Sequence, residues 1–421
     1  MLDLNDIVFE PADLKISALD NFDPLYRIGD YVGHTPPQVA AAYSMPASDG
    51  AGVKIGIIAP AGGGFLQSDL DKTFADLIYS GLISSSTPTP VITQVLLNGQ
   101  SGDFVDTAAS VENTLDIYCL ATLVPAANIV IYIGSNFVST TQQAIDDGCD
   151  IISVSYTVAG GEPSSVTMAA FEYYLLWPAR DAKIAICAAA GDSGSTFEGL
   201  SELKVAYPAS SPNVIAVGGT KLTLNNNNTR LSESDDNRDP SYGPNWGGGG
   251  GISGYFSAPD WQSGLYYTPI VNGTTGTSTT LTQRGLPDIS AAMSNYLMYY
   301  NGSIVGIGGT SASAPVIAGM LARFQSLTGK QRSSPEYNKL FYNHKNSFFD
   351  ILVGTNNNII TSGYKGTVSW DPVTGLGPPT GAQVYRYIKN GLRPTNGDVF
   401  PNNEFDKRPS SGMVWPRTKT L

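Results

Sequence analysis

Short apolar runs recur along the chain and are separated by longer segments in which apolar residues return at every third or fourth position. The runs are four to six β-branched or aliphatic residues long, which predicts strands buried on both faces, as in a mainly parallel sheet. The intervening segments, at about residues 69–79, 104–123, 139–147 and 165–180, predict helices. Strands and helices therefore alternate, and we expect an α/β, doubly wound fold with functional groups at the carboxyl ends of the strands. The predicted strands are Val53–Ile58, Ile129–Ile133, Ile151–Val154, Ile184–Cys187 and Val214–Val217.

Two stretches break this pattern. From Leu222 to Gly254 the chain carries Asn225–Asn228 and five consecutive glycines at Gly247–Gly251, a composition typical of loops. From about Leu392 it carries four prolines and no helical period, which predicts an extended tail that docks on the domain or on a partner. We divide the chain into an N-terminal extension at residues 1–34, one main domain at residues 35–391 and a C-terminal tail at residues 392–421.

The charge balance narrows the range of partners. Charged residues make up 14% of the 421 residues, the net charge is −12 and the isoelectric point is about 4.6. Nucleic acid and anionic membranes repel such a chain, so we expect neither as a partner, and the low charge density suits an acidic environment. The three cysteines are an odd number in apolar surroundings and predict buried free thiols: Cys119, Cys149 and Cys187.

The chain shows neither a membrane segment nor a secretory signal. No apolar run reaches the roughly 18 residues that a membrane-spanning helix needs. The first twenty residues contain Asp3, Asp6, Glu10, Asp13 and Asp20 and lack an apolar core, so we expect no signal peptide in them. These features leave the compartment open.

Ser311 is the first candidate for chemistry. It lies between a strand-like segment at Ser303–Ile307 and an apolar helical run at Val316–Leu327. A serine at the start of a helix faces the positive end of the helix dipole, which stabilises an alkoxide and an oxyanion. The same position also suits a serine that only caps the helix.

A serine nucleophile needs a base, which in most serine peptidases is histidine. The chain has two histidines: His34 in a glycine-rich approach segment and His344 in a polar stretch. Neither lies in a recognisable motif, which indicates that the usual base is absent. A subtilisin-type mechanism with one of these histidines stays an alternative.

Acidic residues offer a different base. Glu112 and Asp116 are one turn apart on a predicted helix, beside the stripe that faces the core. Two carboxyl groups held together in apolar surroundings repel each other, so at least one should have a raised pKa. The alternative is a solvated pair on a helix surface. The core-facing stripe is Phe104, Ala108, Val111, Leu115 and Tyr118, and the wetter side is Ser110, Asn113 and Thr114.

A third acid, Asp192, follows the predicted strand that starts at Ile184. A turn there would place Asp192 at the carboxyl edge of the sheet. Gly-Asp-Ser-Gly is also an ordinary turn sequence, so a purely structural role stays open.

Together these residues and their surroundings resemble the sedolisin family of serine-carboxyl peptidases, over most of the chain. The resemblance implies a subtilisin-like, doubly wound, mainly parallel sheet flanked by helices. The matching segments, in order, are Thr35–Val39 with Ala42–Tyr43, Glu112–Asp116, Pro125–Ala127, Ser153–Ser155 with Glu162, Gly191–Gly194, Tyr207–Pro212, Val217–Thr220, Trp261–Gln262, Pro287–Asp288, Gly309–Ser313 and Trp370–Pro372.

The resemblance implies that Ser311 attacks the scissile carbonyl of a protein or peptide substrate. It implies that Glu112 is the general base and later the acid, and that Asp116 holds Glu112 and shares its proton. Asp192, at a position where subtilisins have asparagine, would be protonated and donate to the oxyanion. Since a carboxyl group donates only while neutral and Glu112 accepts only while ionised, we expect an endopeptidase that works at acidic pH.

The resemblance further implies one structural calcium ion near the C-terminal end of the domain. The expected ligands are the carboxylates of Asp350 and Asp371 and the carbonyls of Ile351, Thr367 and Ser369. Many relatives have glycine at the last two carbonyl positions, so Thr367 and Ser369 are a departure from the pattern. Without a metal, Asp350 and Asp371 would cap the loop.

The termini differ from the family pattern as well. Sedolisins are usually made with a large folded propeptide, whereas about 34 residues precede the domain here, so we expect a processed product or a member without that control. Family resemblance points to an extracellular or acidic compartment. The alternative to an active peptidase is a structural or interaction protein of a larger assembly, built on the same scaffold and joined through its terminal extensions.

Overall fold

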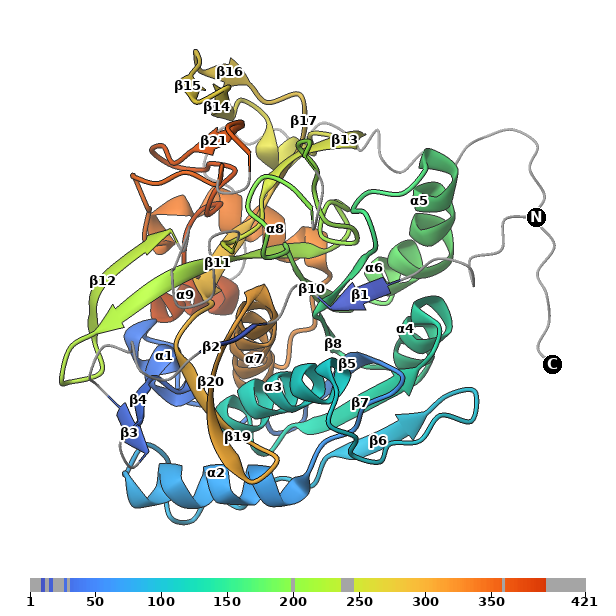
Figure 1. Ribbon diagram of the computed structural model, residues 1–421, viewed down its shortest axis with the longest axis vertical. Helices are drawn as coiled ribbons and strands as arrows, with labels where there is room; N and C mark the ends of the chain where they lie inside the picture. Colours follow the sequence, from blue (N-terminus) through green and yellow to red (C-terminus); the bar gives the residue numbers. More distant parts are fainter. Residues whose placement is uncertain are drawn as a thin grey trace.

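The computed structural model describes residues 9–11, 15–17, 26–28, 31–197, 201–235, 246–357 and 360–390. Its centre is an eight-stranded sheet with the strand order β12-β11-β10-β8-β5-β7-β6, in which β18 also pairs with β11 (Figure 1). Every pairing in it is parallel except that of β11 with β12, so the prediction of a mainly parallel sheet is confirmed. The strands are β5 (Lys54–Pro60), β6 (Thr93–Leu96), β7 (Asn128–Gly134), β8 (Ile151–Val154), β10 (Ala185–Ala189), β11 (Ile215–Leu224), β12 (Arg230–Asp235) and β18 (Ile289–Ala292).

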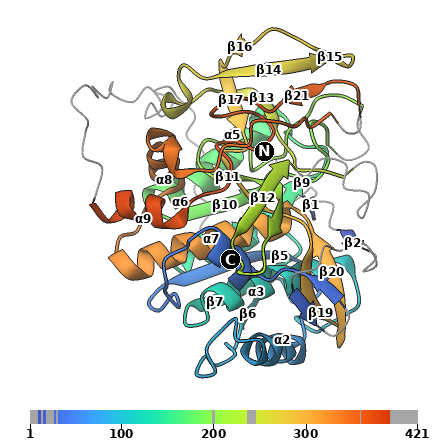
Figure 2. The ribbon, with the colours of Figure 1, turned by 90° about the vertical axis from the view of Figure 1, so that its left-hand side faces the viewer.

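Helices cover both faces of this sheet, as the alternation of elements predicts. Neighbouring residues of β5 point to opposite faces: Ile57 packs in the cluster that contains α3 and α7, and Ile58 packs with α4 and α5 (Figures 1 and 2). The helices on the first face are α3 (Ala108–Leu123), α7 (Thr310–Thr328) and, further out, α2 (Gln67–Tyr79). Those on the second are α4 (Phe137–Asp146), α5 (Ser165–Phe171) and α6 (Trp177–Asp181), the last two joined by a π-helical turn at Glu172–Leu176.

The helix α3 is buried on all sides, so the prediction of a wetter side was wrong. It begins at Ala108, after the cap residue Thr107, whose hydroxyl accepts the Ser110 N–H at 3.3 Å. Ser110 and Asn113 are fully buried because they have partners in the loop after β5. The Ser110 hydroxyl accepts the Gly64 N–H at 3.0 Å, and the Asn113 amide donates to the Gly63 carbonyl at 3.1 Å. Thr114, predicted on the same side, is buried as well.

The stretch from Leu222 to Gly254, predicted to be loop, also contains strands. The strand β11 continues to Leu224 and pairs antiparallel with β12 around a turn at residues 225–229. Further on, β13 (Gly251–Ser257) pairs with β17 (Gln283–Leu286). The glycines before β13 allow close packing: a Cβ on Gly249 would lie 2.2 Å from the Ala190 carbonyl oxygen. Residues 236–245 of this stretch lie outside the described residues.

The N-terminal extension is described only as short strands. β1 (Phe9–Pro11) pairs with β9 (Tyr156–Val158), and β2 (Lys15–Ser17) pairs with β20 (Ser303–Gly308). The predicted docking tail at residues 392–421 lies outside the described residues and stays a prediction. Within the described ranges, no helix has the length and apolar character needed to cross a bilayer. The remaining elements named below are β3 (Tyr26–Ile28), β4 (Tyr31–Gly33), β19 (Tyr296–Tyr300), α8 (Ser334–Asn343) and α9 (Gly381–Asn390).

Candidate active site

Ser311 is the second residue of α7, directly after the strand β20 and Gly309. It is fully buried, and the first turn of its helix leaves backbone N–H groups without helical partners beside it. Gly309 has φ +151°, which favours glycine, and a Cβ there would lie 2.8 Å from Asp192 Oδ2. The chain therefore turns from strand to helix at a position where a side chain would displace Asp192.

The helix α3 brings Glu112 and Asp116 to the same place. Both carboxyl groups are fully buried. The hydroxyl of Ser155, which follows β8, donates to Asp116 Oδ1 at 2.7 Å and lies 3.4 Å from the main-chain carbonyl oxygen of Ser311. Both carboxyl oxygens of Glu112 and the Ser311 hydroxyl are buried without a hydrogen-bond partner among the described residues. Burial raises the pKa of Glu112, and the nearby hydroxyl groups of Ser311 and Ser155 oppose that rise.

Asp192 completes the cluster from the turn after β10. The N–H and the hydroxyl of Thr310 both donate to Asp192 Oδ1, each at 2.7 Å. The Gly191 N–H in turn donates to the Thr310 hydroxyl at 3.2 Å. These bonds fix Asp192 to the residue before Ser311.

Burial dominates the electrostatics of the cluster. It raises the pKa of Glu112 well above the ordinary value, and the nearby Asp116 and Asp192 raise it further. Burial also raises the pKa of Asp116 to about 8, against a smaller opposing effect of the Ser155 hydrogen bond. The pair therefore keeps at least one proton far above the pH at which ordinary carboxyl groups ionise.

Neither histidine contacts Ser311 in the described part of the chain. His34 is buried against the ring of Tyr296, 4.6 Å between ring centroids, and burial lowers its pKa to about 3. His344, after α8, stacks on Tyr387 at 3.6 Å. The titratable side chains gathered near Ser311 are thus carboxyl groups, and the alternative with a histidine has no support in the geometry.

Two contacts at this site could not be predicted from the sequence. Thr310 holds Asp192, and Ser155 holds Asp116, although nothing in the local sequence assigns either residue a role. The one indication in the sequence is the position of Ser155, which follows a buried strand at the carboxyl edge of the sheet. The cysteines agree with their prediction, because all three are free and buried.

The predicted calcium ligands lie on one loop system. The Ser369 N–H donates to Asp350 Oδ2 at 2.6 Å, and the Thr367 N–H donates to Asp371 Oδ2 at 2.9 Å. Ile351 enters the same loop, with its carbonyl oxygen 3.4 Å from the position of a Cβ on Gly366. Ser369 has φ +74°, a left-handed conformation that favours glycine. Asp350 Oδ1 is buried and has no hydrogen-bond partner among the described residues.

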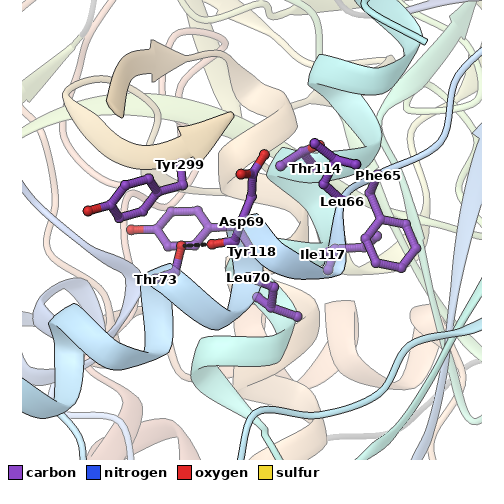
Figure 3. Close-up of a pocket in the computed structure, with 9 residues that line it drawn as sticks. All are labelled: Phe65, Leu66, Asp69, Leu70, Thr73, Thr114, Ile117, Tyr118 and Tyr299. Carbon is purple, nitrogen blue, oxygen red and sulfur yellow. Dashed lines mark hydrogen bonds between the residues drawn. The ribbon is translucent and has the colours of Figure 1, made fainter. Parts of the chain in front are cut away.

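A small pocket lies on another side of α3, between that helix, α2 and β19 (Figure 3). Asp69 from α2 points into it, and Asp69 Oδ1 accepts the Gly302 N–H at 2.9 Å. None of the four clustered active-site candidates lines this pocket. The hydrogen bond between Asp69 and Gly302 joins the β19–β20 hairpin, which leads to Ser311, to α2.

Comparisons with known proteins agree with this geometry. A model of the subtilase family matches residues 113–347. Kumamolisin of Bacillus sp. (strain MN-32) is 32% identical over 404 residues, which cover 92% of this chain and 69% of kumamolisin. Sedolisin of Pseudomonas sp. (strain 101) is 38% identical over 205 residues, which cover 47% of this chain and 31% of that protein.

Two further comparisons concern another kind of peptidase and the fold. Tripeptidyl-peptidase 1 of Dictyostelium discoideum is 37% identical over 190 residues, which cover 43% of this chain and 29% of that protein. The structure of Pseudomonas sedolisin, a serine-carboxyl proteinase complexed with two molecules of pseudo-iodotyrostatin, superposes with a TM-score of 0.65 at 24% identity. The match covers 85% of this chain and 98% of the sedolisin chain, so the two share the subtilisin-like fold.

Proposed function

The chain belongs to the sedolisin family of serine-type peptidases, and on this premise we propose that it is an endopeptidase that hydrolyses unfolded proteins at acidic pH. One observation carries the proposal. Three carboxyl groups and one serine hydroxyl, all buried, gather at the start of α7, and no imidazole contacts them in the described part of the chain.

The proposed reaction proceeds from the state in which the Glu112–Asp116 pair holds one proton, on Asp116. The Ser311 hydroxyl attacks the scissile carbonyl carbon while the ionised Glu112 accepts its proton. The tetrahedral intermediate then collapses, the C–N bond breaks, and Glu112 gives the proton to the departing amine. Water hydrolyses the acyl ester by the same two proton transfers. Asp116, held by Ser155, keeps Glu112 in place and shares its proton through the cycle.

The neutral carboxyl group of Asp192 donates a hydrogen bond to the oxyanion that forms during the attack, and so stabilises it. With Asp192 Oδ1 accepting two hydrogen bonds from Thr310, the proton of the neutral acid belongs on Oδ2, beside Gly309. Loss of one oxyanion donor costs about 3 kcal/mol of transition-state stabilisation, which is about a hundredfold in rate. Ionisation of Asp192 removes this donor and adds a negative charge, so the rate falls as the pH rises.

We also propose one structural calcium ion between Asp350 and Asp371. The loop offers the hard oxygen ligands that calcium prefers, with carbonyls of Ile351, Thr367 and Ser369 to complete the set. The buried, unpartnered Asp350 Oδ1 fits a cation, since a buried carboxylate oxygen without a donor is otherwise unfavourable. The ion would hold the loop in place and take no part in the chemistry.

The direct test is cleavage of denatured casein between pH 3 and 8, with Ser311→Ala as the inactive control. We expect activity in acid that declines well below neutrality, and none from the control. No cleavage by the unaltered chain at any pH would favour the interaction protein built on the same scaffold.

Two variants test the assigned roles. Glu112→Gln should be almost inactive, because an amide cannot accept the proton. Asp192→Ala should lose about a hundredfold in kcat with little change in KM, and its residual rate should decline less steeply toward neutral pH. A profile flat from pH 4 to 8 in the unaltered chain would contradict the oxyanion role.

A further inference from the structure

A carboxylate oxygen lies buried and unpartnered in the wall of the cavity between α2, α3 and β19 (Figure 3). Asp69 is 1% exposed, and its carboxyl group points into this cavity. Asp69 Oδ1 accepts the Gly302 N–H at 2.9 Å, whereas Asp69 Oδ2 has no hydrogen bond and no ion pair among the described residues. Burial of such an oxygen without a donor or a cation is unfavourable, so the oxygen indicates a ligand in the cavity.

The cavity is small, and two hydroxyl groups from its wall can only accept. Its volume of about 10 Å³ for the centre of a water-sized sphere leaves room for one water molecule or one ion of that size. The Thr73 hydroxyl donates to the main-chain carbonyl oxygen of Asp69 at 2.9 Å, and the Thr114 hydroxyl donates to that of Ser110 at 2.7 Å. Each hydroxyl uses its one proton there and keeps only lone pairs for a ligand. The other lining residues are Phe65, Leu66, Leu70, Ile117, Tyr118 and Tyr299.

The charge around the cavity is negative. Among the described residues, three aspartates but one lysine bond to Tyr299–Gly302, the end of the β19–β20 hairpin. Besides Asp69, the acids are Asp76, which accepts the Tyr299 hydroxyl at 2.6 Å, and Asp106, which accepts the Tyr300 hydroxyl at 2.7 Å. The lysine is Lys72, whose Nζ donates to the Gly302 carbonyl at 3.3 Å and forms no ion pair with Asp69. A bound cation would offset this excess of negative charge, which a water molecule would not.

We infer that this cavity binds one monovalent cation of about the size of a water molecule, such as potassium or ammonium. Asp69 Oδ2 supplies the negative charge, and the hydroxyl oxygens of Thr73 and Thr114 supply neutral ligands. One carboxylate balances the single charge of such an ion. Magnesium fits poorly, because it usually keeps several of its waters and the cavity has room for one particle of that size.

The bound ion would tie three elements together. Asp69 belongs to α2 and Thr114 to α3, and Asp69 also holds Gly302 at the end of the β19–β20 hairpin. An ion that binds the folded chain and not the unfolded chain stabilises the fold by mass action, so the thermal midpoint depends on its concentration. This inference does not rest on the proposed function, since the cavity lies apart from Ser311 and the other three active-site candidates.

Thermal unfolding in different salts tests the inference. At pH 6, at constant ionic strength and with calcium present throughout, the midpoint of the unaltered chain should be about 2–5 °C higher in potassium or ammonium chloride than in choline chloride. Asp69→Asn keeps the shape of the side chain and the acceptor for Gly302 but removes the charge, so its midpoint should be the same in all three salts. Asp71→Asn is the matched control. Asp71 is exposed on the same helix, where it accepts only from the Gln67 side chain at 3.3 Å, so this variant should respond as the unaltered chain does.

Thallium(I), an anomalous scatterer with the charge and about the size of potassium, locates the ion directly. Crystals soaked in thallium(I) acetate should show an anomalous peak at coordination distance from Asp69 Oδ2, and crystals of Asp69→Asn should show none there. Equal midpoints of the unaltered chain in potassium and choline chloride would overturn the inference and leave water in the cavity. A potassium effect that persists in Asp69→Asn, or the absence of the thallium peak, would overturn it as well. Neither measurement needs activity, so an inactive protein would count against the proposed function and not against this site.

Discussion

The Ser155 hydroxyl donates to Asp116 Oδ1 at 2.7 Å, and among the described residues Asp116 Oδ2 has no hydrogen-bond partner. Ser155 therefore lowers the proton affinity of the Glu112–Asp116 pair. Its hydrogen bond lowers the pKa of Asp116 against the larger effect of burial. It lowers the pKa of Glu112 as well.

Ser155→Ala should lower kcat about two- to tenfold, because Asp116 is neutral at acidic pH and a neutral hydrogen bond contributes about 0.5–1.5 kcal/mol. With that bond gone, burial raises the pKa of the pair further, so the acid limb of the kcat profile should move to higher pH. The measurement is the pH dependence of kcat and KM. Ser153→Ala, at a buried serine within β8, is the control and should leave the profile in place. An unshifted acid limb in Ser155→Ala would remove Ser155 from the proton network.

Gly309 tests whether the position of Asp192 matters for the rate. Gly309→Ala adds a Cβ 2.8 Å from Asp192 Oδ2 at φ +151°. Gly302→Ala, at the other end of β20, has a similar conformational penalty at φ +77°, but its nearest neighbour is the flexible Lys72 Nζ at 3.3 Å. Both variants should lose about 1–3 kcal/mol of stability, and Gly309→Ala alone should lose tenfold or more in kcat. Equal kcat losses in the two variants would indicate a general effect of backbone strain.

Buried acids make the stability depend on pH in an unusual direction. Burial raises the pKa of Asp116 to about 8 and that of Glu172 to about 7, whereas both ionise near pH 4 in an unfolded chain. The folded chain therefore binds more protons than the unfolded chain between these values. The stabilisation that these two buried acids contribute is complete below about pH 4 and is lost as the pH rises through about 7 and 8.

Thermal unfolding from pH 4 to 8 checks this sign. The midpoint should fall by several degrees over the range. Asp116→Asn and Glu172→Gln should each flatten the decline, while Asp181→Asn, on an exposed carboxylate, should not change it. A midpoint that rises toward pH 8 would show that other groups dominate the linkage.

The sequence located the active-site candidates better than it described their surroundings. The spacing of Glu112 and Asp116 on a helix is local, and so is the position of Ser311 at a helix start. Both could be read from periodicity. The burial of Ser110 and Asn113 on α3 could not, because these side chains hydrogen-bond to backbone groups of residues 63 and 64, nearly fifty positions earlier.

Long-range pairing explains the other differences. The strand β12 reads as part of a polar loop, since its residues lie at the sheet edge and only Glu233 is buried within it. That carboxyl group accepts hydrogen bonds from Tyr43 and Thr220, both at 2.6 Å. No local pattern in Arg230–Asp235 predicts these contacts. The role of Ser155 is hidden for the same reason, because its partner is 39 positions away.

The calcium proposal predicts a stability that depends on the metal. Removal of calcium with EDTA should lower the thermal midpoint, and saturation at about 100 times Kd should restore about 2.7 kcal/mol. The thermal midpoint of Asp350→Asn should be the same with and without calcium, and so should that of Asp371→Asn. The midpoint of Asp181→Asn should rise with calcium as that of the unaltered chain does. Metal analysis that finds no calcium, together with an unchanged midpoint in EDTA, would leave the two acids as loop caps.

Ser369 refines this test because its backbone keeps a glycine-like conformation, φ +74°. If the loop has that shape in order to turn carbonyls toward an ion, Ser369→Gly should relieve strain of about 1 kcal/mol and preserve the response to calcium. Ser369→Ala should keep the strain and the response, since only the backbone is a ligand. A serine hydroxyl that binds the metal would reverse this, because both variants would then lose calcium affinity. Comparing the calcium dependence of the two variants therefore separates a carbonyl ligand from a side-chain ligand at this position.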